Sequence, residues 1–388
     1  MARLILALTL IVGLAACRVP RPEPDYSRPL AAGAPALLPL GPNEPLPDFS
    51  AEWHRRDATR EALTGSLQWM AKPSARGHFP AAGIEFDRAL ASLQRFSELL
   101  DQASSGDDFS QRLQREFTVY KSAGWDGRGG GVLFTGYYTP ILDGSRNPTD
   151  TFRYPLYALP PDLVKDEAGR TLGRQTAMGM REGYPSRGTI DRTGMLADKG
   201  LELAWMRDPF DAYIAHVNGS AVLRLRDGSL MRLGYAGNNG HEYRSMREAL
   251  VRDRKIDGDT ANLVTMRQWA AESPGEVQEY MARNPRYVFF TPIHGSPRGS
   301  LNVEVTAERT LATDKALFPR AAIVYVDASL GRKGAGKPFS TFMFDQDTGG
   351  AIRTAGRADI YLGTGRAAER LAGTTQNEGQ LYYLFLKE

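Results

Sequence analysis

Two aspartates near the C-terminus flank a glycine pair and could carry proton-transfer chemistry. Asp347 precedes Gly349-Gly350, which lets the backbone approach a ligand or another strand closely, and Asp359 follows in the same stretch. The neighbours of Asp359 are small or apolar, and such surroundings disfavour the charged form of a carboxyl group. Cleavage of a glycosidic bond requires a protonated carboxylic acid near neutral pH, because the leaving oxygen must receive a proton. We therefore expect Asp359 to act as a general acid.

Two alternative roles are open to these aspartates. An aspartate beside a glycine turn often serves only as a cap or turn residue. The triplet Asp347-Thr348-Gly349 matches the Asp-Thr-Gly of aspartic proteases, in which two such carboxylates share one proton. The sequence contains no second Asp-Thr-Gly or Asp-Ser-Gly, so a protease of this kind would require a symmetric dimer.

The chain before the aspartates changes from helical to β character. Apolar residues recur at helical spacing over residues 85–120, where Asp107 or Asp108 could cap a second helix. A strand is expected over residues 132–138. Alternating runs on either side of Asp227-Gly228 predict a hairpin, because glycine accepts the positive φ of a tight turn.

The second half of the chain begins with helices and ends in short strands. Residues 243–284 have helical periodicity, with apolar side chains at buried spacing. The runs that follow are short, have β character and are separated by glycine and proline turns, which predicts a compact barrel. These expected strands cover residues 287–291, 302–306, 321–327, 339–344 and 381–385.

Composition excludes several classes of function. The 388 residues carry a formal net charge of only +3, so nothing global indicates a nucleic-acid partner, although an acidic polymer is permitted. The five histidines are far apart, no two have the spacing of metal ligands, and the single cysteine offers no thiolate pair. We expect neither a metal nor a cofactor.

The N-terminus predicts export and a lipid anchor. One cation, Arg3, precedes an apolar run that is too short for the roughly 20 residues of a membrane span and ends at Cys17. Leu14-Ala15-Ala16-Cys17 looks like the lipobox of bacterial lipoproteins, with residues 1–16 as the signal peptide. The alternative is an ordinary secretory signal, which would leave an exposed free thiol in an oxidising compartment. Residues 17–50 are rich in proline and are expected to form an extended tether, on the order of 100 Å long at about 3.1 Å per residue.

Seven separated blocks resemble the membrane-bound lytic murein transglycosylase A family, from about Val132 to the C-terminus. The blocks are Phe134-Thr135-Gly136-Tyr137-Tyr138-Thr139-Pro140, Tyr154-Pro155-Leu156-Tyr157, Leu203-Ala204-Trp205, Tyr235-Ala236-Gly237-Asn238-Asn239-Gly240, Asn284-Pro285-Arg286-Tyr287-Val288-Phe289-Phe290, Ala312-Thr313-Asp314, and Asp347-Thr348-Gly349-Gly350-Ala351-Ile352 with Ala358-Asp359-Ile360-Tyr361.

The resemblance implies a mainly β fold with N-terminal helices. The expected catalytic domain is a double-psi β-barrel made from residues 51–140 and 288–388. A smaller β domain, residues 141–287, is inserted and forms the other wall of a glycan cleft.

The resemblance also assigns roles to residues. Asp314, Asp347 and Asp359 match the three aspartates that give the C-terminal module its name, and Asp359 matches the catalytic acid. Asp347 is expected to support it and Asp314 to be structural. The other residues expected to bind or support the substrate are Thr135, Tyr137, Tyr138, Gly349, Gly350, Tyr361, Asn218 and Ser220. A buried strand would use tyrosines as well, so packing remains an alternative for the tyrosines.

Two departures from the family pattern affect binding more than chemistry. The chain has Val217-Asn218-Gly219-Ser220-Ala221 where relatives often have Ile-Gln-Gly-Ser-Gly, and Ile360 precedes Tyr361 where many relatives have an aromatic pair. Contacts of the inserted domain with glycan are therefore less strongly implied than those of the barrel.

The implied activity is lytic cleavage of peptidoglycan. Asp359 would protonate the oxygen between N-acetylmuramic acid and N-acetylglucosamine, and the 6-hydroxyl would close a 1,6-anhydro ring without water. A non-catalytic, expansin-like wall-binding module and a hydrolase on the same substrate are the alternatives. The implied partners are peptidoglycan strands, the outer membrane through lipid on Cys17, and cell-wall synthesis complexes. Arg18 is unlike the Asp that retains lipoproteins in the inner membrane, so the periplasmic face of a Gram-negative outer membrane is the expected location.

Overall fold

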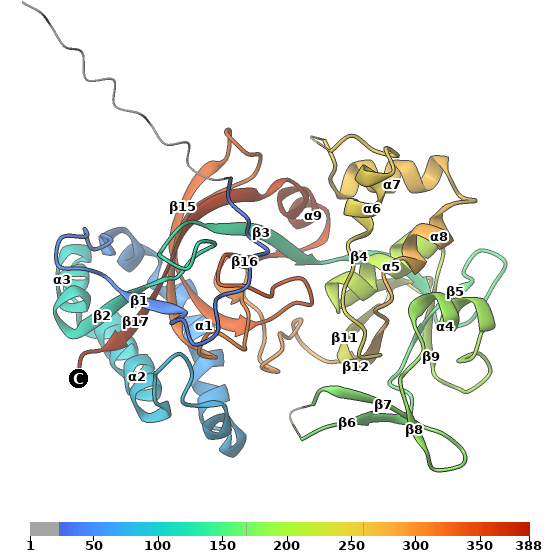
Figure 1. Cartoon of the computed structure of the whole chain (residues 1–388), viewed down its shortest axis with the longest axis horizontal. Coiled ribbons are helices and arrows are strands. Elements are labelled where there is room, and N and C mark those ends of the chain that lie inside the picture. The colour runs from blue at the N-terminus through green and yellow to red at the C-terminus, as the bar shows by residue number, and fades with distance from the viewer. Residues whose placement is uncertain (1–22, 168, 259) are drawn as a thin grey trace, which may run out of the picture.

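The computed structural model describes residues 23–167, 169–258 and 260–388, so the predicted signal peptide and Cys17 lie outside the described residues. The chain forms two β units side by side (Figure 1), here called the first barrel and the second barrel. Two connections join them: Pro140 between strands β3 and β4, and residues 294–309 between β12 and β13. Among the described residues, no helix combines the length and the apolar character needed to cross a membrane.

The first barrel closes through six strands. Strand order is β17-β14-β15-β13-β16-β3, and β3 pairs again with β17 to complete the ring. Neighbours β3 and β16 run parallel, as do β13 and β15. The strands are β3 (Val132–Thr139), β13 (Thr310–Ala312), β14 (Ile323–Leu330), β15 (Lys337–Asp347), β16 (Arg357–Thr364) and β17 (Gln376–Leu386). Strands β2 (Phe117–Ser122) and β1 (Leu37–Pro39) extend the sheet beyond β17.

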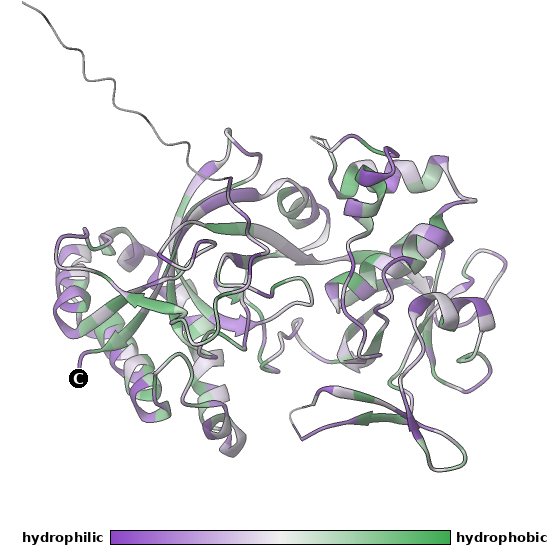
Figure 2. Cartoon of the chain, viewed as in Figure 1, coloured by the Kyte–Doolittle hydropathy of each residue, from purple (hydrophilic) through white to green (hydrophobic). Residues whose placement is uncertain are grey.

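Helices from the N-terminal part cover the first barrel. They are the 3₁₀ helices η1 (Ser50–Arg55) and η2 (Pro73–His78) and the α-helices α1 (Arg56–Met70), α2 (Phe86–Gln102) and α3 (Gly106–Glu116). Their apolar stripes share one core with the strands: the Phe96 ring lies 4.9 Å from that of Phe342, centre to centre. Figure 2 shows hydrophobic and hydrophilic residues alternating along these outer helices. The predicted cap of α3 was wrong by a few residues: the N-cap is Ser105, whose side chain accepts from the Asp108 N–H, while the Asp108 carboxylate accepts from the Ser104 N–H outside the helix.

The proline-rich segment differs from the expected free tether. Leu37–Pro39 forms strand β1 on the edge of the sheet, where proline is tolerated because it needs no ladder donor. Phe49 is fully buried beneath η1. Nearer the start, the Tyr26 carbonyl accepts from Thr354 Oγ1 at 2.7 Å. Residues 23–49, here called the strap, therefore lie along the first barrel.

The second barrel is nearly closed. Its strand order is β12-β11-β10-β4-β9-β5, and a parallel bridge between Ala158 and Phe290 brings the two ends together. The strands are β4 (Ile141–Ser145), β5 (Tyr154–Tyr157), β9 (Glu202–Met206), β10 (Ala221–Leu225), β11 (Leu230–Asn238) and β12 (Val288–Ile293). The predicted hairpin at Asp227-Gly228 is confirmed as the antiparallel β10–β11 pair.

Further elements decorate both barrels. Helices of the second unit are α4 (Arg187–Thr193), α5 (Pro209–Asn218), α6 (Met246–Arg252), α7 (Leu263–Glu272) and α8 (Val277–Ala282). A separate small sheet contains β6 (Leu163–Lys165), β7 (Thr171–Gln175) and β8 (Arg181–Glu182). Helix α9 (Gly365–Thr374) follows β16 and packs against β3.

The predicted mainly β fold, with N-terminal helices and a second β unit, is confirmed, but two details differ. The expected boundary after residue 287 cuts too early, because β12 pairs with β11 and Phe290 belongs to the core of the second barrel. The strand expected over residues 302–306 is a loop: Val303 and Val305 are buried, but only an isolated bridge between Arg298 and Glu304 forms.

Candidate active site

Asp359 lies on β16 between two other strands of the first barrel. In the register of the sheet it is opposite Thr135 on β3 and Ala312 on β13. Its side chain is 19% exposed, whereas the neighbours Ala358 and Ile360 are fully buried on the opposite face of the strand. The strand therefore presents one carboxylate to solvent from a rigid, apolar support.

Asp359 has few polar partners. Thr135 Oγ1 donates to its Oδ1. Arg357, two residues earlier on the same face of β16, has its Nη2 atom 3.6 Å from that oxygen and 3.3 Å from Thr135 Oγ1. None of the described residues hydrogen-bonds to Oδ2 of Asp359, so that oxygen can exchange a proton with a ligand.

Four of the predicted site residues, Thr135 and Tyr137 of β3 and Asp359 and Tyr361 of β16, lie on one face of two parallel strands. Tyr361 is opposite Tyr137 in the register, and their ring centres lie 5.2 Å apart. Thr139 lies 3.1 Å from the Tyr361 hydroxyl and 3.4 Å from Ser220 Oγ of the second barrel. Alternate residues of a strand share a face, which is why Thr135, Tyr137 and Thr139 come together.

Asp347 differs from Asp359 because its acceptors are occupied. Its Oδ1 accepts from the backbone N–H groups of Ser300 and Thr348, at 2.7 and 2.8 Å, and its Oδ2 accepts from the Tyr137 hydroxyl at 2.7 Å. Burial raises the pKa of Asp347, although these hydrogen bonds oppose the shift. Burial also raises the pKa of Tyr137, as does the neighbouring Asp347. This carboxylate can therefore hold Tyr137 in position but has little capacity left for a ligand.

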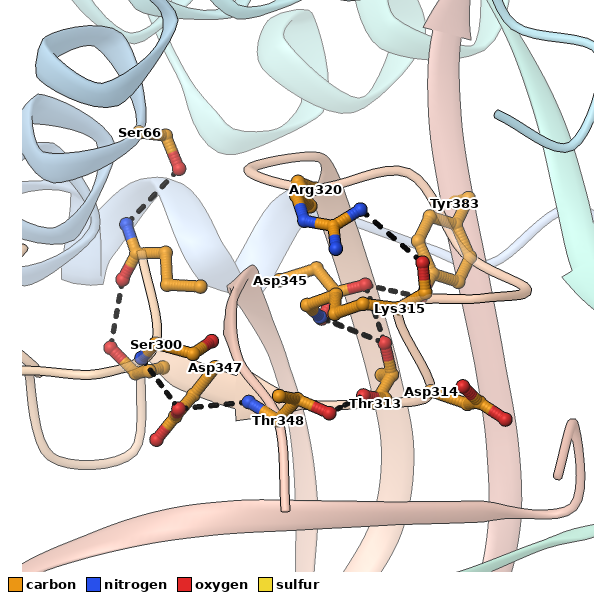
Figure 3. Close-up of polar contacts among 12 residues, drawn as sticks. Ser66, Ser300, Thr313, Asp314, Lys315, Arg320, Asp345, Asp347, Thr348 and Tyr383 are labelled. Carbon is orange, nitrogen blue, oxygen red and sulfur yellow. Dashed lines mark hydrogen bonds and ion pairs between the residues drawn. The ribbon is translucent and has the colours of Figure 1, made fainter. Parts of the chain in front are cut away.

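A second buried aspartate, which the sequence did not reveal as a site residue, lies behind Asp347. Asp345 is fully buried and accepts from Thr313 Oγ1 at 2.9 and 2.7 Å, from the Tyr383 hydroxyl at 2.8 Å, and from Lys315 Nζ. Figure 3 shows these side chains converging on the carboxylate. Burial lowers the pKa of Lys315, while Asp345 opposes that shift. The available signal was a charge directly after the apolar run Phe342–Phe344, because a charge that is buried requires partners.

The buried cluster continues to the active-site turn. Thr348 Oγ1 donates to the Thr313 carbonyl at 2.8 Å, and the backbone N–H of Thr348 donates to Asp347 (Figure 3). A continuous set of hydrogen bonds thus joins Asp345 in the core to Asp347 and Tyr137 beside the catalytic face.

The other predicted residues divide into two groups. Gly350 allows a close approach, because a Cβ there would lie 3.2 Å from Tyr243 Cβ and 3.5 Å from Arg286 Nε of the second barrel. A Cβ on Gly349 would meet only Ile352 of the same turn, at 3.3 Å. Ser220 joins the site through Thr139, as described above.

Three predicted residues lie away from the catalytic face. Tyr138 points to the opposite side of β3, where it is 4% exposed and burial raises its pKa. Asn218 donates to the Ile214 carbonyl at 2.9 Å in its own helix. Asp314 Oδ1 accepts from the Ala316 N–H at 3.0 Å and shapes the turn after β13. Among the described residues, no group of three or more His, Cys, Asp or Glu side chains could hold a metal ion.

Comparison with known proteins matches both halves of this arrangement. Residues 133–291 match the model of the MltA specific insert domain, and residues 309–385 match the 3D domain. The chain is 30% identical over 286 residues to membrane-bound lytic murein transglycosylase A of Escherichia coli K12, covering 72% of each chain.

Solved structures agree with the fold. The crystal structure of a membrane-bound lytic murein transglycosylase from Agrobacterium tumefaciens has 28% identity and a TM-score of 0.77, covering 90% of this chain and 98% of that one. The structure of E. coli MltA with bound chitohexaose has 24% identity and a TM-score of 0.64, covering 94% and 97%, and supports the fold alone. The chain belongs to the membrane-bound lytic murein transglycosylase A family.

Proposed function

We propose that this chain cleaves the bond between N-acetylmuramic acid and N-acetylglucosamine in peptidoglycan, with Asp359 as the only acid and base. Membership of a family named for murein transglycosylase activity supports the reaction. The observation that carries the assignment of Asp359 is the contrast between two carboxylates. Asp347 accepts three hydrogen bonds, whereas Asp359 is reached by solvent and has one oxygen that accepts from none of the described residues.

In the first step Asp359 donates its proton to the glycosidic oxygen as the bond from that oxygen to C1 of muramic acid breaks. Thr135 holds the carboxyl group through Oδ1, which leaves Oδ2 to face the sugar. The carboxylate produced in this step is stabilised by the guanidinium of Arg357.

In the second step the 6-hydroxyl of the same muramic acid attacks C1, and its proton passes to the Asp359 carboxylate. The acid is thereby regenerated, a 1,6-anhydro ring forms and no water is consumed. Holding the hydroxyl near C1 replaces a bimolecular reaction, an effect worth about 7 to 11 kcal/mol in favourable cases. Tyr137 is half-buried, is held by Asp347 and offers its ring to the sugar beside the acid, whereas Tyr361 is buried and supports the Tyr137 ring.

Mass spectrometry of fragments released from purified peptidoglycan tests this reaction. We expect 1,6-anhydromuramoyl ends from the wild type, and a loss of roughly 10²- to 10⁴-fold in rate for Asp359→Asn, the usual contribution of general acid–base catalysis. The variant should still bind chitohexaose and melt like the wild type. Reducing ends would indicate a hydrolase, binding without any product would indicate a wall-binding module, and full activity in the variant would assign the acid elsewhere.

We also propose that lipid on Cys17 anchors the chain to the periplasmic face of the outer membrane. Relatives are named membrane-bound, and the strap shortens the reach of such an anchor. At about 3.3–3.6 Å per residue, the chain from Cys17 to Tyr26 spans at most roughly 30 Å, well below the roughly 100 Å expected for a free tether. The first barrel would therefore work close to the membrane. Association with cell-wall synthesis complexes remains a prediction from the family resemblance.

Fractionation of cells that express Cys17→Ser tests the anchor. The wild type should be found with outer membranes and should incorporate labelled fatty acid, whereas the variant should do neither. A wild-type chain found in the soluble periplasmic fraction would contradict the proposal.

A further inference from the structure

Two arginines from different barrels meet beside Gly350. Arg353 lies on the turn between Asp347 and Asp359, is exposed, and donates from Nε to the Gly350 carbonyl at 3.3 Å. Arg286 of the second barrel is half-buried and donates from Nη1 to the His241 carbonyl at 3.1 Å. A Cβ built on Gly350 would lie 3.5 Å from Arg286 Nε, so both guanidinium groups border the same glycine.

Neither arginine has a carboxylate partner within ion-pair distance among residues 23–167, 169–258 and 260–388. Two other half-buried arginines of the second barrel do have carboxylate partners: Arg267 contacts Asp211 and Glu369, and Arg283 contacts Asp253 and Glu279. Burial lowers the pKa of Arg286, and the like charge of Arg353 acts in the same direction. Holding two cations close together without a counter-charge costs free energy that a bound anion would recover.

The surroundings suit a substituted sugar. Tyr235 is 48% exposed and offers a flat ring to a sugar. It lies close enough to Arg286 to oppose the fall in the pKa of that arginine. The turn that carries Arg353 leads directly into β16, where Arg357 and Asp359 lie. The two arginines thus lie where the turn that precedes β16 approaches the second barrel.

We propose that Arg286 and Arg353 form a subsite for a carboxylate carried by the substituent on muramic acid, a proposal that rests on the function proposed above. The lactyl ether of muramic acid ends in a carboxylate when free, and otherwise continues into a peptide that bears carboxylates of its own. Each guanidinium can offer paired donors to such a group. A chito-oligosaccharide lacks the lactyl substituent and would leave this subsite empty.

Binding measurements with three ligands test the subsite. Arg286→Gln, Arg353→Gln and the double variant are prepared on the inactive Asp359→Asn chain, and affinity is measured for chitohexaose, for peptide-free glycan strands and for glycan strands that carry peptides. Arg332→Gln is the matched control, because Arg332 is exposed and lies in the turn before β15, at the other end of that strand from Asp347. Thermal melting of each variant checks that it folds.

We expect each single substitution to weaken binding of an anionic glycan by roughly fivefold, as for one partly exposed ion pair, with a smaller loss at high salt. Chitohexaose binding and the Arg332→Gln control should be unchanged. A loss limited to peptide-bearing strands identifies a peptide carboxylate, and a loss limited to peptide-free strands identifies the lactyl carboxylate. A loss on both glycans shows that the subsite accepts either carboxylate. Equal weakening for all three ligands, or none for the anionic ones, overturns the subsite. Failure of the proposed function is seen separately, as reducing ends released by the wild type.

Discussion

The two barrels contribute to the active site in different ways. On the first barrel, polar side chains bond to one another: Thr135 to Asp359, and Tyr137 to Asp347. On the second barrel, Asn218 and Arg286 bond to nearby backbone, and Tyr235 keeps an exposed ring although its hydroxyl accepts from Asn238 of the same strand. The chemistry is therefore preorganised on one side, while the groups on the other side remain available to a ligand.

The same contrast holds for charges. The Lys315–Asp345 pair of the first barrel is 6% and 0% exposed, whereas the Arg224–Asp143 pair of the second barrel is 60% and 51% exposed. A buried pair needs every remaining lone pair satisfied, which Thr313 and Tyr383 achieve for Asp345. An exposed pair is solvated in either state and contributes little.

The largest expected effect comes from breaking the buried pair. Lys315→Ala leaves the Asp345 carboxylate uncompensated in the core and should lower the free energy of unfolding by about 3 to 5 kcal/mol. Arg224→Ala should change it by no more than about 1 kcal/mol. Urea denaturation of both variants measures the difference. Similar small losses in both would mean that water reaches Asp345, and that the first barrel is less rigidly organised than its contacts suggest.

Much of the catalytic face could be predicted from the sequence, because Thr135, Tyr137, Asp359 and Tyr361 are alternate residues on two strands. Their spacing assigns them to one face before any pairing is known. The blocks that resemble a known family assigned the two stretches to one site, and the structure shows that they pair as β3 and β16. The same alternation places Tyr138 on the opposite face of β3, because adjacent residues of a strand point in opposite directions.

The rest depended on long-range register. Lys315 and Asp345 are far apart in sequence and meet only because β13 runs parallel to β15, with Ala312 opposite Asp347. The strap could not be recognised either, because its prolines predicted an extended, unpaired chain. Leu37–Pro39 nevertheless forms an edge strand, which pairs with β2 alone and can therefore tolerate proline. The approach of Arg286 to Gly350 could not be predicted from the sequence, because it depends on how the two barrels are placed relative to each other.

Asp347 and Asp227 should respond to pH with opposite signs. Burial raises the pKa of Asp347 above 3.8, so the folded chain holds this proton more tightly than the unfolded chain does. That contribution to stability is present below about pH 3.8 and is lost as the pH rises through the folded pKa. Relative to the wild type, Asp347→Asn should therefore gain stability as the pH rises, by at most about 1.4 kcal/mol per pH unit.

Asp227 of the second barrel provides the control. Hydrogen bonds from Ser229 lower its pKa, so its contribution is present above the unfolded pKa and is lost as the pH falls. Asp227→Asn should consequently lose stability relative to the wild type as the pH rises through the acidic range. Urea denaturation at a series of pH values measures both trends. The same sign for the two variants would contradict the environment described for Asp347.

The smallest expected effect comes from loosening the strap, which lies outside the first barrel and contacts the turn between Asp347 and Asp359. Thr354 is 2% exposed, lies on the turn between the two aspartates, and holds the Tyr26 carbonyl. Thr354→Val keeps the shape but removes one neutral hydrogen bond, so opening of the strap should become easier by about 1 kcal/mol. Hydrogen exchange at the Arg28 amide, which bonds to the Asp25 carbonyl, should then be roughly fivefold faster.

Thr193→Val is the matched control on the second barrel, because Thr193 donates at 2.8 Å to the Thr189 carbonyl within its own helix. Exchange at Arg28 should not change in that variant. If Thr354→Val also lowers kcat without raising KM, the strap positions the turn that joins Asp347 to Asp359. The strap, which is the described segment nearest the predicted lipid site, would then help to hold the catalytic groups of the first barrel in place. If exchange is unchanged in both variants, the Thr354 hydrogen bond does not hold the strap, and preorganisation is confined to the barrel itself.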